Sequence, residues 1–224
     1  MLLALLACVP HAAVAPPPPA PAPSASYGPS RPAAEIAAVA GPVNLPADLP
    51  GVGPADALVE VVTFSDYQCP YCAHLFPLLL ELAERRPDIR FRFGSFPLDM
   101  DCNPSVSSHM HRYACQASVG AVCADAQGKY VAFASALYAN PEQITPPALP
   151  FFADRAGLEI VAYGTCVNDP ATTAKLAEHV AAAVALDVQG TPTVLVRGLT
   201  DEGWVQLSGE ATAILGAIEG APQR

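Results

Sequence analysis

The chain has 224 residues, which is room for one ordinary domain with appendages. Its formal net charge is −10, from 21 acidic and 11 basic residues. No run of basic residues is present to hold a phosphate backbone, so the composition argues against a nucleic-acid partner. Hydrophobic residues make up 52% of the chain, enough for a sizeable core, and seven cysteines suit an oxidising compartment.

Residues 1–8 form a short apolar run that ends at Cys8. The run resembles a bacterial lipoprotein signal with the lipobox Leu-Leu-Ala-Cys, in which cleavage before Cys8 would leave a lipidated, membrane-tethered chain. Because a basic n-region is missing, two alternatives stay open: an ordinary or truncated secretory signal, and an apolar tail without signal function. The run is far too short to span a bilayer.

Residues 9–54 have the composition of a linker, rich in proline and alanine. Such a segment cannot bury enough surface to offset its ordering entropy, so we expect it to be largely disordered. Its prolines favour an extended spacer that would hold the folded domain away from a membrane. Residues 33–40 can form a transient helix within it. We expect the folded domain to span residues 55–220 and to start near Asp56.

A Cys-Pro-Tyr-Cys tetrapeptide at residues 69–72 lies between an expected strand and an expected helix. Residues 57–63 are apolar and β-branched, as in a buried strand. Residues 73–86 repeat apolar side chains at helical spacing and end in two basic residues, which suit a helix C-terminus. The tetrapeptide therefore falls at a helix N-terminus.

This location predicts thiol chemistry. Free N–H groups and the positive end of the helix dipole stabilise a thiolate, so we predict that Cys69 is an exposed, acidified nucleophile. Pro70 suits the first helical turn, and Cys72 lies on the same face as a more buried, less acidic resolving thiol. Half of a zinc site or an inert structural pair are the alternatives, although no second Cys-x-x-Cys follows.

The remaining pattern predicts a strand, an alanine-rich helical region, a hairpin and a last helix. Asp169 is a plausible N-cap, with Pro170 at the first helical position. The strand is expected at residues 89–96 and the helical region at 104–157, with breaks near 127–128, 140–141 and 146–147. Two further helices are expected at 159–167 and 170–186. The hairpin is expected at 193–197 and 204–207, and the last helix at 211–219.

Four further cysteines are candidates for structural disulfides. Cys115 and Cys123 are eight residues apart on one expected helix, about 12 Å along its axis, which exceeds disulfide reach. If all four are paired, each of these two joins Cys102 or Cys166, and two of the three connectivities survive. Free buried thiols are the alternative.

Three histidines have alternative interpretations. A metal site made by Cys102, His109, His111 and Cys115 would offer thiolates and imidazoles, but histidines two residues apart on a helix point in different directions. His74, two residues after the tetrapeptide, is expected to be exposed or to touch a mixed disulfide.

The segment Phe-Ser-Asp-Tyr-Gln-Cys-Pro-Tyr-Cys at residues 64–72 resembles the active-site signature of DsbA-like thioredoxin-fold proteins. Val-Gln-Gly-Thr-Pro-Thr-Val at residues 188–194 resembles the loop that carries the cis-proline of that family. The resemblance implies an α/β thioredoxin fold with an inserted helical region at about residues 104–187. In that family the loop packs beside the two cysteines, and the backbone of Thr191 pairs with an extended substrate by strand addition. A trans Gly-Thr-Pro turn at Pro192 is the alternative.

One position departs from the family pattern. Related proteins often carry a glutamate six residues before the first cysteine as a proton carrier for the buried thiol, and Thr63 stands there. Glu60 is expected to point to the other face of the sheet, and Asp66 to lie near the surface. The group that handles the proton of Cys72 therefore stays open.

The resemblance implies a monomeric thiol:disulfide oxidoreductase of the bacterial periplasm or cell envelope, with cysteine-containing protein substrates. Its redox centre would be the Cys69–Cys72 disulfide, with no separate cofactor and no metal. Pro70 and Tyr71 between the cysteines tune the redox poise. We expect an oxidase, reoxidised by a DsbB-like membrane protein or a vitamin K epoxide reductase homologue. A periplasmic reductase or isomerase, and a non-catalytic binding module, are the alternatives.

Overall fold

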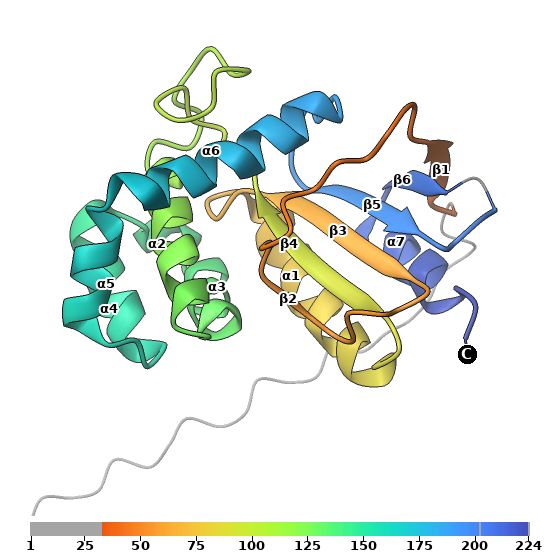
Figure 1. Ribbon diagram of the computed structural model, residues 1–224, viewed down its shortest axis with the longest axis horizontal. Helices are drawn as coiled ribbons and strands as arrows, with labels where there is room; N and C mark the ends of the chain where they lie inside the picture. Colours follow the sequence, from red (N-terminus) through yellow and green to blue (C-terminus); the bar gives the residue numbers. More distant parts are fainter. Residues whose placement is uncertain (1–32, 202, 224) are drawn as a thin grey trace, which may run out of the picture. The chain divides into compact units, whose positions relative to one another are not determined.

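The computed structural model describes residues 33–201 and 203–223. Within them, six strands form one sheet in the order β1-β6-β5-β3-β4-β2 (Figure 1). β3 and β4 run parallel, whereas every other neighbouring pair is antiparallel. The strands are β1 Glu35–Ala38, β2 Gly51–Val52, β3 Glu60–Ser65, β4 Arg90–Ser95, β5 Thr193–Arg197 and β6 Trp204–Ser208.

Helices cover both faces of this sheet. On one face, α1 and α7 share a core with apolar residues of β3, β4, β5 and β6, whereas the end of α6 packs on the other face. Figure 1 shows α6 running from the inserted helices to the sheet. The helices are α1 Pro70–Arg85, α2 Ala114–Ala126, α3 Tyr130–Tyr138, α4 Leu149–Arg155, α5 Ile160–Val167, α6 Pro170–Ala185 and α7 Ala211–Glu219, with 3-10 turns at Pro141–Gln143 and Pro146–Ala148.

β3 is buried on both faces, and alternate side chains enter different cores. Val61 belongs to the core under α1, whereas Val62 and Phe64 belong to the core under α6. On the neighbouring strand, a Cβ on Gly94 would lie 2.6 Å from the Phe64 ring, so only glycine leaves room for that ring. The central strand that leads to the Cys-Pro-Tyr-Cys segment is thus held from both sides.

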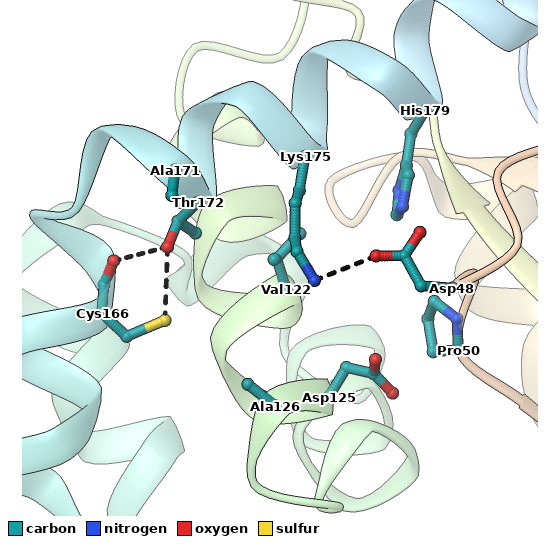
Figure 2. Close-up of a pocket in the computed structure, with 10 residues that line it drawn as sticks. All are labelled: Asp48, Pro50, Val122, Asp125, Ala126, Cys166, Ala171, Thr172, Lys175 and His179. Carbon is teal, nitrogen blue, oxygen red and sulfur yellow. Dashed lines mark hydrogen bonds and ion pairs between the residues drawn. The ribbon is translucent and has the colours of Figure 1, made fainter.

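The N-terminal boundary of the fold differs from the sequence-based prediction. Residues 35–38 form β1, an edge strand paired with β6, so the expected transient helix over residues 33–40 is wrong. Leu49 is buried, and Asp48 forms an ion pair with Lys175 of α6, with 2.9 Å between Oδ2 and Nζ (Figure 2). The folded unit therefore includes residues 33–54, which composition alone placed in the linker. Residues 1–32, including Cys8, lie outside the described residues.

The inserted helices confirm most of the sequence-based bounds. Breaks occur at all three expected places, and the Asp169 side chain accepts a hydrogen bond from the N–H of Ala171 at 2.8 Å, as expected of an N-cap. The region begins later than expected, because residues 101–113 precede α2 as turns and loops. Among the described residues, no helix has the length and apolar character needed to cross a bilayer.

Two disulfides fasten the helical insert. Cys102 is bonded to Cys115 and Cys123 to Cys166, with Cα–Cα distances of 5.9 and 5.8 Å. This is one of the two connectivities that the spacing allows. Because Cys102 and Cys115 are bonded to each other, they cannot supply thiolates to the alternative metal site with His109 and His111, and that interpretation is wrong.

Candidate active site

Cys69 and Cys72 begin α1 immediately after the turn that follows β3. Cys69 is the N-cap residue, Pro70 follows in the first turn, and the N–H of Ala73 donates the first helical hydrogen bond to the Cys69 carbonyl at 3.0 Å. The predicted strand-to-helix position is therefore confirmed. Both cysteines are free thiols in this structure. The other four described cysteines are consumed by disulfides, so none is left to complete a zinc site here.

The loop before β5 lies against the first cysteine. The Thr191–Pro192 peptide bond is cis, and the Cys69 thiol donates a hydrogen bond to the Thr191 carbonyl at 3.4 Å. The expected cis-proline and its place beside the active cysteines are both confirmed.

The predicted exposure of Cys69 is wrong. Its residue surface is 3% exposed, and that of Cys72 is 1%. The cis-proline loop lies against Cys69, a contact between residues 122 positions apart that local helix geometry does not reveal. Tyr71, between the two cysteines, is 73% exposed. A substrate would thus meet the tyrosine side chain first.

The pKa values of the two thiols are shifted in opposite directions. A hydrogen bond from the Cys72 thiol, together with the Thr191 side chain and the N–H groups of Cys72 and Tyr71, lowers the pKa of Cys69 to about 6 against the opposing effect of burial. Burial raises the pKa of Cys72, and so do its hydrogen bond and its proximity to the Cys69 thiolate. The acidified first thiol and the less acidic second thiol match the sequence-based prediction.

The lowered pKa of Cys69 gives a direct titration test. In the reduced protein, we expect the thiolate absorbance near 240 nm to appear with a midpoint near pH 6, because Cys69 ionises there and Cys72 stays protonated. Above this midpoint the thiolate is present, and below it the thiolate is lost. Cys69→Ser should remove the transition, and the unfolded protein should titrate near the ordinary value of about 8.5. A folded-state midpoint near that ordinary value would contradict the assignment.

The two carboxylates near the site, Glu60 and Asp66, lie in different surroundings. Glu60 points away from the cysteines, as expected, and pairs with Arg92 at 3.3 Å and Arg197 at 2.8 Å. The expectation that Asp66 lies near the surface is wrong, because its side chain is 0% exposed. Thr63, at the position of the family glutamate, is buried and has no carboxylate to offer.

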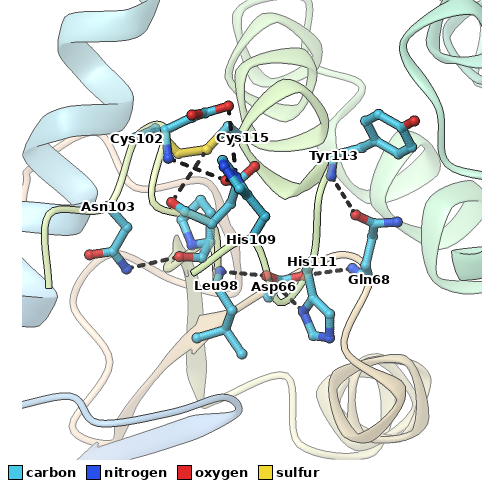
Figure 3. Close-up of a disulfide and its surroundings, with 12 residues drawn as sticks. Asp66, Gln68, Leu98, Cys102, Asn103, His109, His111, Tyr113 and Cys115 are labelled. Atoms are coloured by element: carbon cyan, nitrogen blue, oxygen red, sulfur yellow. Dashed lines mark hydrogen bonds and ion pairs between the residues drawn. A yellow bond between two sulfur atoms is a disulfide. The ribbon is translucent and has the colours of Figure 1, made fainter. Parts of the chain in front are cut away.

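Asp66 is held by partners that sequence reasoning did not identify. Its carboxylate accepts hydrogen bonds from the N–H groups of Gln68 and Leu98, both at 2.7 Å, and lies 3.0 Å from Nδ1 of His111. Gln68 in turn accepts a hydrogen bond from the N–H of Tyr113 at 2.8 Å (Figure 3). The polar residues Asp66 and Gln68 within the signature were the available signal, but their partners outside the signature (Leu98, His111 and Tyr113) lie at least 30 residues away in the sequence.

A groove of about 270 Å³ is lined by Tyr71, which lies between the two cysteines in the sequence, and by the cis-proline Pro192. The rest of the lining comes from His74 and Leu75 of α1, residues 206–211 and Ile214. His74 is exposed there, in agreement with its predicted exposure. Through Tyr71 and Pro192 the groove lies close to the two cysteines, although neither cysteine lines it.

Residues 60–217 match the family described as the DSBA-like thioredoxin domain. The chain belongs to this family. Solved structures agree with the fold of this DSBA-like protein. A thioredoxin-like oxidoreductase from Silicibacter pomeroyi DSS-3 is 25% identical with a TM-score of 0.60, over 78% of this chain and 92% of that chain. Pseudomonas aeruginosa DsbA2 is 24% identical with a TM-score of 0.61, over 79% of this chain and 95% of that chain. Wolbachia pipientis alpha-DsbA1 is 17% identical with a TM-score of 0.64, over 79% of this chain and 92% of that chain.

Curated relatives of the DSBA-like protein are much longer. The Na(+)/H(+) antiporter NhaA 3 of Salinispora tropica is 28% identical over 172 residues, which cover 77% of this chain and 25% of the antiporter. NhaA 1 of Salinispora arenicola is 29% identical, with the same coverage. The chain thus spans about a quarter of the length of these relatives, and the likeness concerns that segment of them.

Proposed function

We propose that this DSBA-like protein is a thiol:disulfide oxidoreductase that oxidises cysteine pairs in other proteins. One observation carries the proposal: an acidified Cys69 at a helix N-terminus hydrogen-bonds to the cis-proline loop, with Cys72 beside it as a less acidic partner. Low acidity of a thiol makes it a poor leaving group, whereas an acidic thiol leaves readily and favours the reduced enzyme. These properties support an oxidase over a reductase or isomerase.

The proposed reaction begins with the oxidised Cys69–Cys72 disulfide. A substrate thiolate attacks Sγ of Cys69, the bond to Cys72 breaks, and Cys72 takes up a proton. A second substrate thiolate then attacks the substrate sulfur of this mixed disulfide and releases the Cys69 thiolate. Two electrons pass from the substrate dithiol to the enzyme cysteines, and the substrate gains one disulfide.

The groove beside Pro192 supports a polypeptide substrate. Tyr71 is exposed and lines this groove. The backbone of Thr191, which contacts Cys69 and precedes Pro192, would pair with an extended chain by strand addition. Binding there would bring a substrate cysteine next to Cys69. The substrates we propose are unfolded or flexible proteins that contain pairs of cysteines.

We propose an extracytoplasmic location, as in the bacterial periplasm or cell envelope. The two disulfides of the insert support it, because such bonds persist in oxidising compartments. Reoxidation would come from a DsbB-like membrane protein or a vitamin K epoxide reductase homologue, and a lipid anchor at Cys8 would raise the local concentration for that encounter.

Equilibration with glutathione tests the direction of electron flow. We expect a reduction potential more oxidising than about −180 mV, because the stabilised Cys69 thiolate favours the dithiol form. The oxidised protein should also introduce disulfides into a reduced, unfolded model substrate. A potential near that of thioredoxin, about −270 mV, would indicate a reductase instead. Cysteines that exchange with neither glutathione nor substrate would indicate a binding module.

A further inference from the structure

The loop between β4 and α2 is tied to the active-site turn at several points. The N–H of Leu98 donates to the Asp66 carboxylate, and the N–H of His111 donates to the Leu98 carbonyl at 3.1 Å. Tyr113 donates to the Gln68 side chain, and the Cys102–Cys115 disulfide joins this loop to α2. Figure 3 shows the disulfide, His111 and Asp66 in one cluster. The loop therefore has a fixed position relative to the turn that leads into Cys69.

His111 is the member of this cluster that can carry a positive charge. Its Nδ1 lies 3.0 Å from Oδ2 of Asp66, and its side chain is 17% exposed. The Asp66 carbonyl accepts a hydrogen bond from the N–H of Cys69 at 3.2 Å, so the residue that holds the histidine also belongs to the turn of the nucleophile. A fully buried carboxylate needs hydrogen bonds and a positive partner; the N–H groups of Gln68 and Leu98 supply the hydrogen bonds, and His111 is the partner that can supply the charge.

Two negatively charged groups, the Asp66 carboxylate and the Cys69 thiolate, act on His111. The Asp66 carboxylate raises the pKa of His111 most, burial opposes it, and the Cys69 thiolate raises it further. Such coupling is reciprocal, so a protonated His111 must favour the Cys69 thiolate by the same free energy. The tetrapeptide contains no cation of its own, because Tyr71 and Pro70 separate the two cysteines.

We infer that His111, held by Asp66, is a positioning residue that supplies from a distant loop the positive charge that favours the Cys69 thiolate, and thereby the dithiol form of the protein. The inference rests on the proposed thiol–disulfide exchange for its functional meaning. Its effect is present while His111 is protonated and fades as the pH rises and the imidazole loses its charge. The loop disulfide contributes by keeping His111 in place.

The first test compares His111→Gln with the matched control His109→Gln. His109 lies on the same loop but pairs with Asp99, at 2.6 Å, and not with Asp66. In His111→Gln, we expect the midpoint of the Cys69 thiolate titration to rise by about half to one pH unit, which corresponds to a threefold to tenfold change in the thiolate equilibrium. The equilibrium with glutathione should shift threefold to tenfold toward the disulfide form. His109→Gln should leave both unchanged.

His111→Lys provides the conservative rescue. Lysine keeps a positive charge across the whole range, so we expect it to restore most of the shift toward the Cys69 thiolate. Equal thiolate titrations for the wild type and His111→Gln would overturn the inference while leaving the proposed function intact. Conversely, a wild type that transfers no disulfide would refute the proposed function, and the titrations would still decide whether His111 acts on Cys69.

A reciprocal measurement does not require a His111 variant to fold. The His111 ring resonance, followed by NMR in the reduced protein against pH, should titrate at a lower pH in Cys69→Ala than in the wild type, because the thiolate that favours its protonated form is gone. An unchanged His111 midpoint would overturn the inference.

Discussion

Replacing Cys69 with serine is expected to lower disulfide transfer by about a thousandfold or more, to the level of the uncatalysed reaction. A serine hydroxyl cannot form the mixed disulfide, and it has no acidity near neutral pH that would replace the thiolate. Cys72 is almost fully buried and its pKa is raised, so it cannot take over as the nucleophile. The measurement is the rate at which the oxidised protein introduces disulfides into a reduced, unfolded substrate.

Cys72→Ala is the matched variant for this prediction. It keeps the nucleophile but removes the thiol with which Cys69 forms the resting disulfide, and which releases a trapped substrate by attacking back at Cys69. Mixed disulfides with substrate proteins should therefore accumulate through Cys69, visible as reductant-sensitive adducts on gels and identifiable by mass spectrometry. Full activity in Cys69→Ser, or adducts on Cys69→Ser in place of Cys72→Ala, would contradict the assigned roles.

Features with a local physical cause could be predicted from the sequence. The Cys-Pro-Tyr-Cys position followed from a β-branched run and a helical repeat on either side of it. The start of α6 followed from an Asp169 cap and Pro170, whose effects act within one turn. Helix geometry also limited the disulfide map to two options, and the structure has one of them. The cis-proline loop was expected from the resemblance of residues 188–194 to the corresponding loop of DsbA-like proteins.

Features that depend on distant partners could not be predicted in this way. Asp66 is buried because the loop that carries Leu98 and His111 folds over it. Likewise, Cys69 is covered by a loop that begins more than 100 residues later. The alanine-rich sequence of β1 has no strong strand propensity. This strand forms because the edge of β6 offers unpaired backbone groups with which it pairs. In each case the tertiary contact outweighed the local pattern.

The acidity of Cys69 depends on groups from several parts of the chain. The helix N-terminus alone predicts an acidic thiol, but the structure adds the neighbouring second thiol and two contributors that are distant in sequence, the cis-proline loop and the His111–Asp66 pair. Each acts through a charge or hydrogen bond on the same sulfur atom. The redox poise of such a protein therefore depends on residues well outside the tetrapeptide, and it can be changed without altering the tetrapeptide.

Removal of the Cys123–Cys166 disulfide is the second large effect that we expect. The bond joins α2 to α5 across a sequence separation of 43 residues, and Cys123 is completely buried. Closing a loop of that length removes entropy from the unfolded chain worth about 4 kcal/mol. Cys123→Ala combined with Cys166→Ala should lower the free energy of unfolding by about that amount, and the melting temperature by roughly 10 °C. Urea unfolding of the oxidised proteins measures it.

The other disulfide gives the matched control and separates stability from redox function. Cys102 and Cys115 are only 13 residues apart, so their replacement by alanine should cost about 3 kcal/mol. That pair, however, fastens the loop that carries His111, so its loss should also raise the midpoint of the Cys69 thiolate titration. Loss of Cys123–Cys166 should leave this midpoint unchanged, because the bond holds helices of the insert and not the loop. A larger stability loss from the shorter loop would contradict the entropic argument, and equal titration shifts in both variants would contradict the role given to the loop.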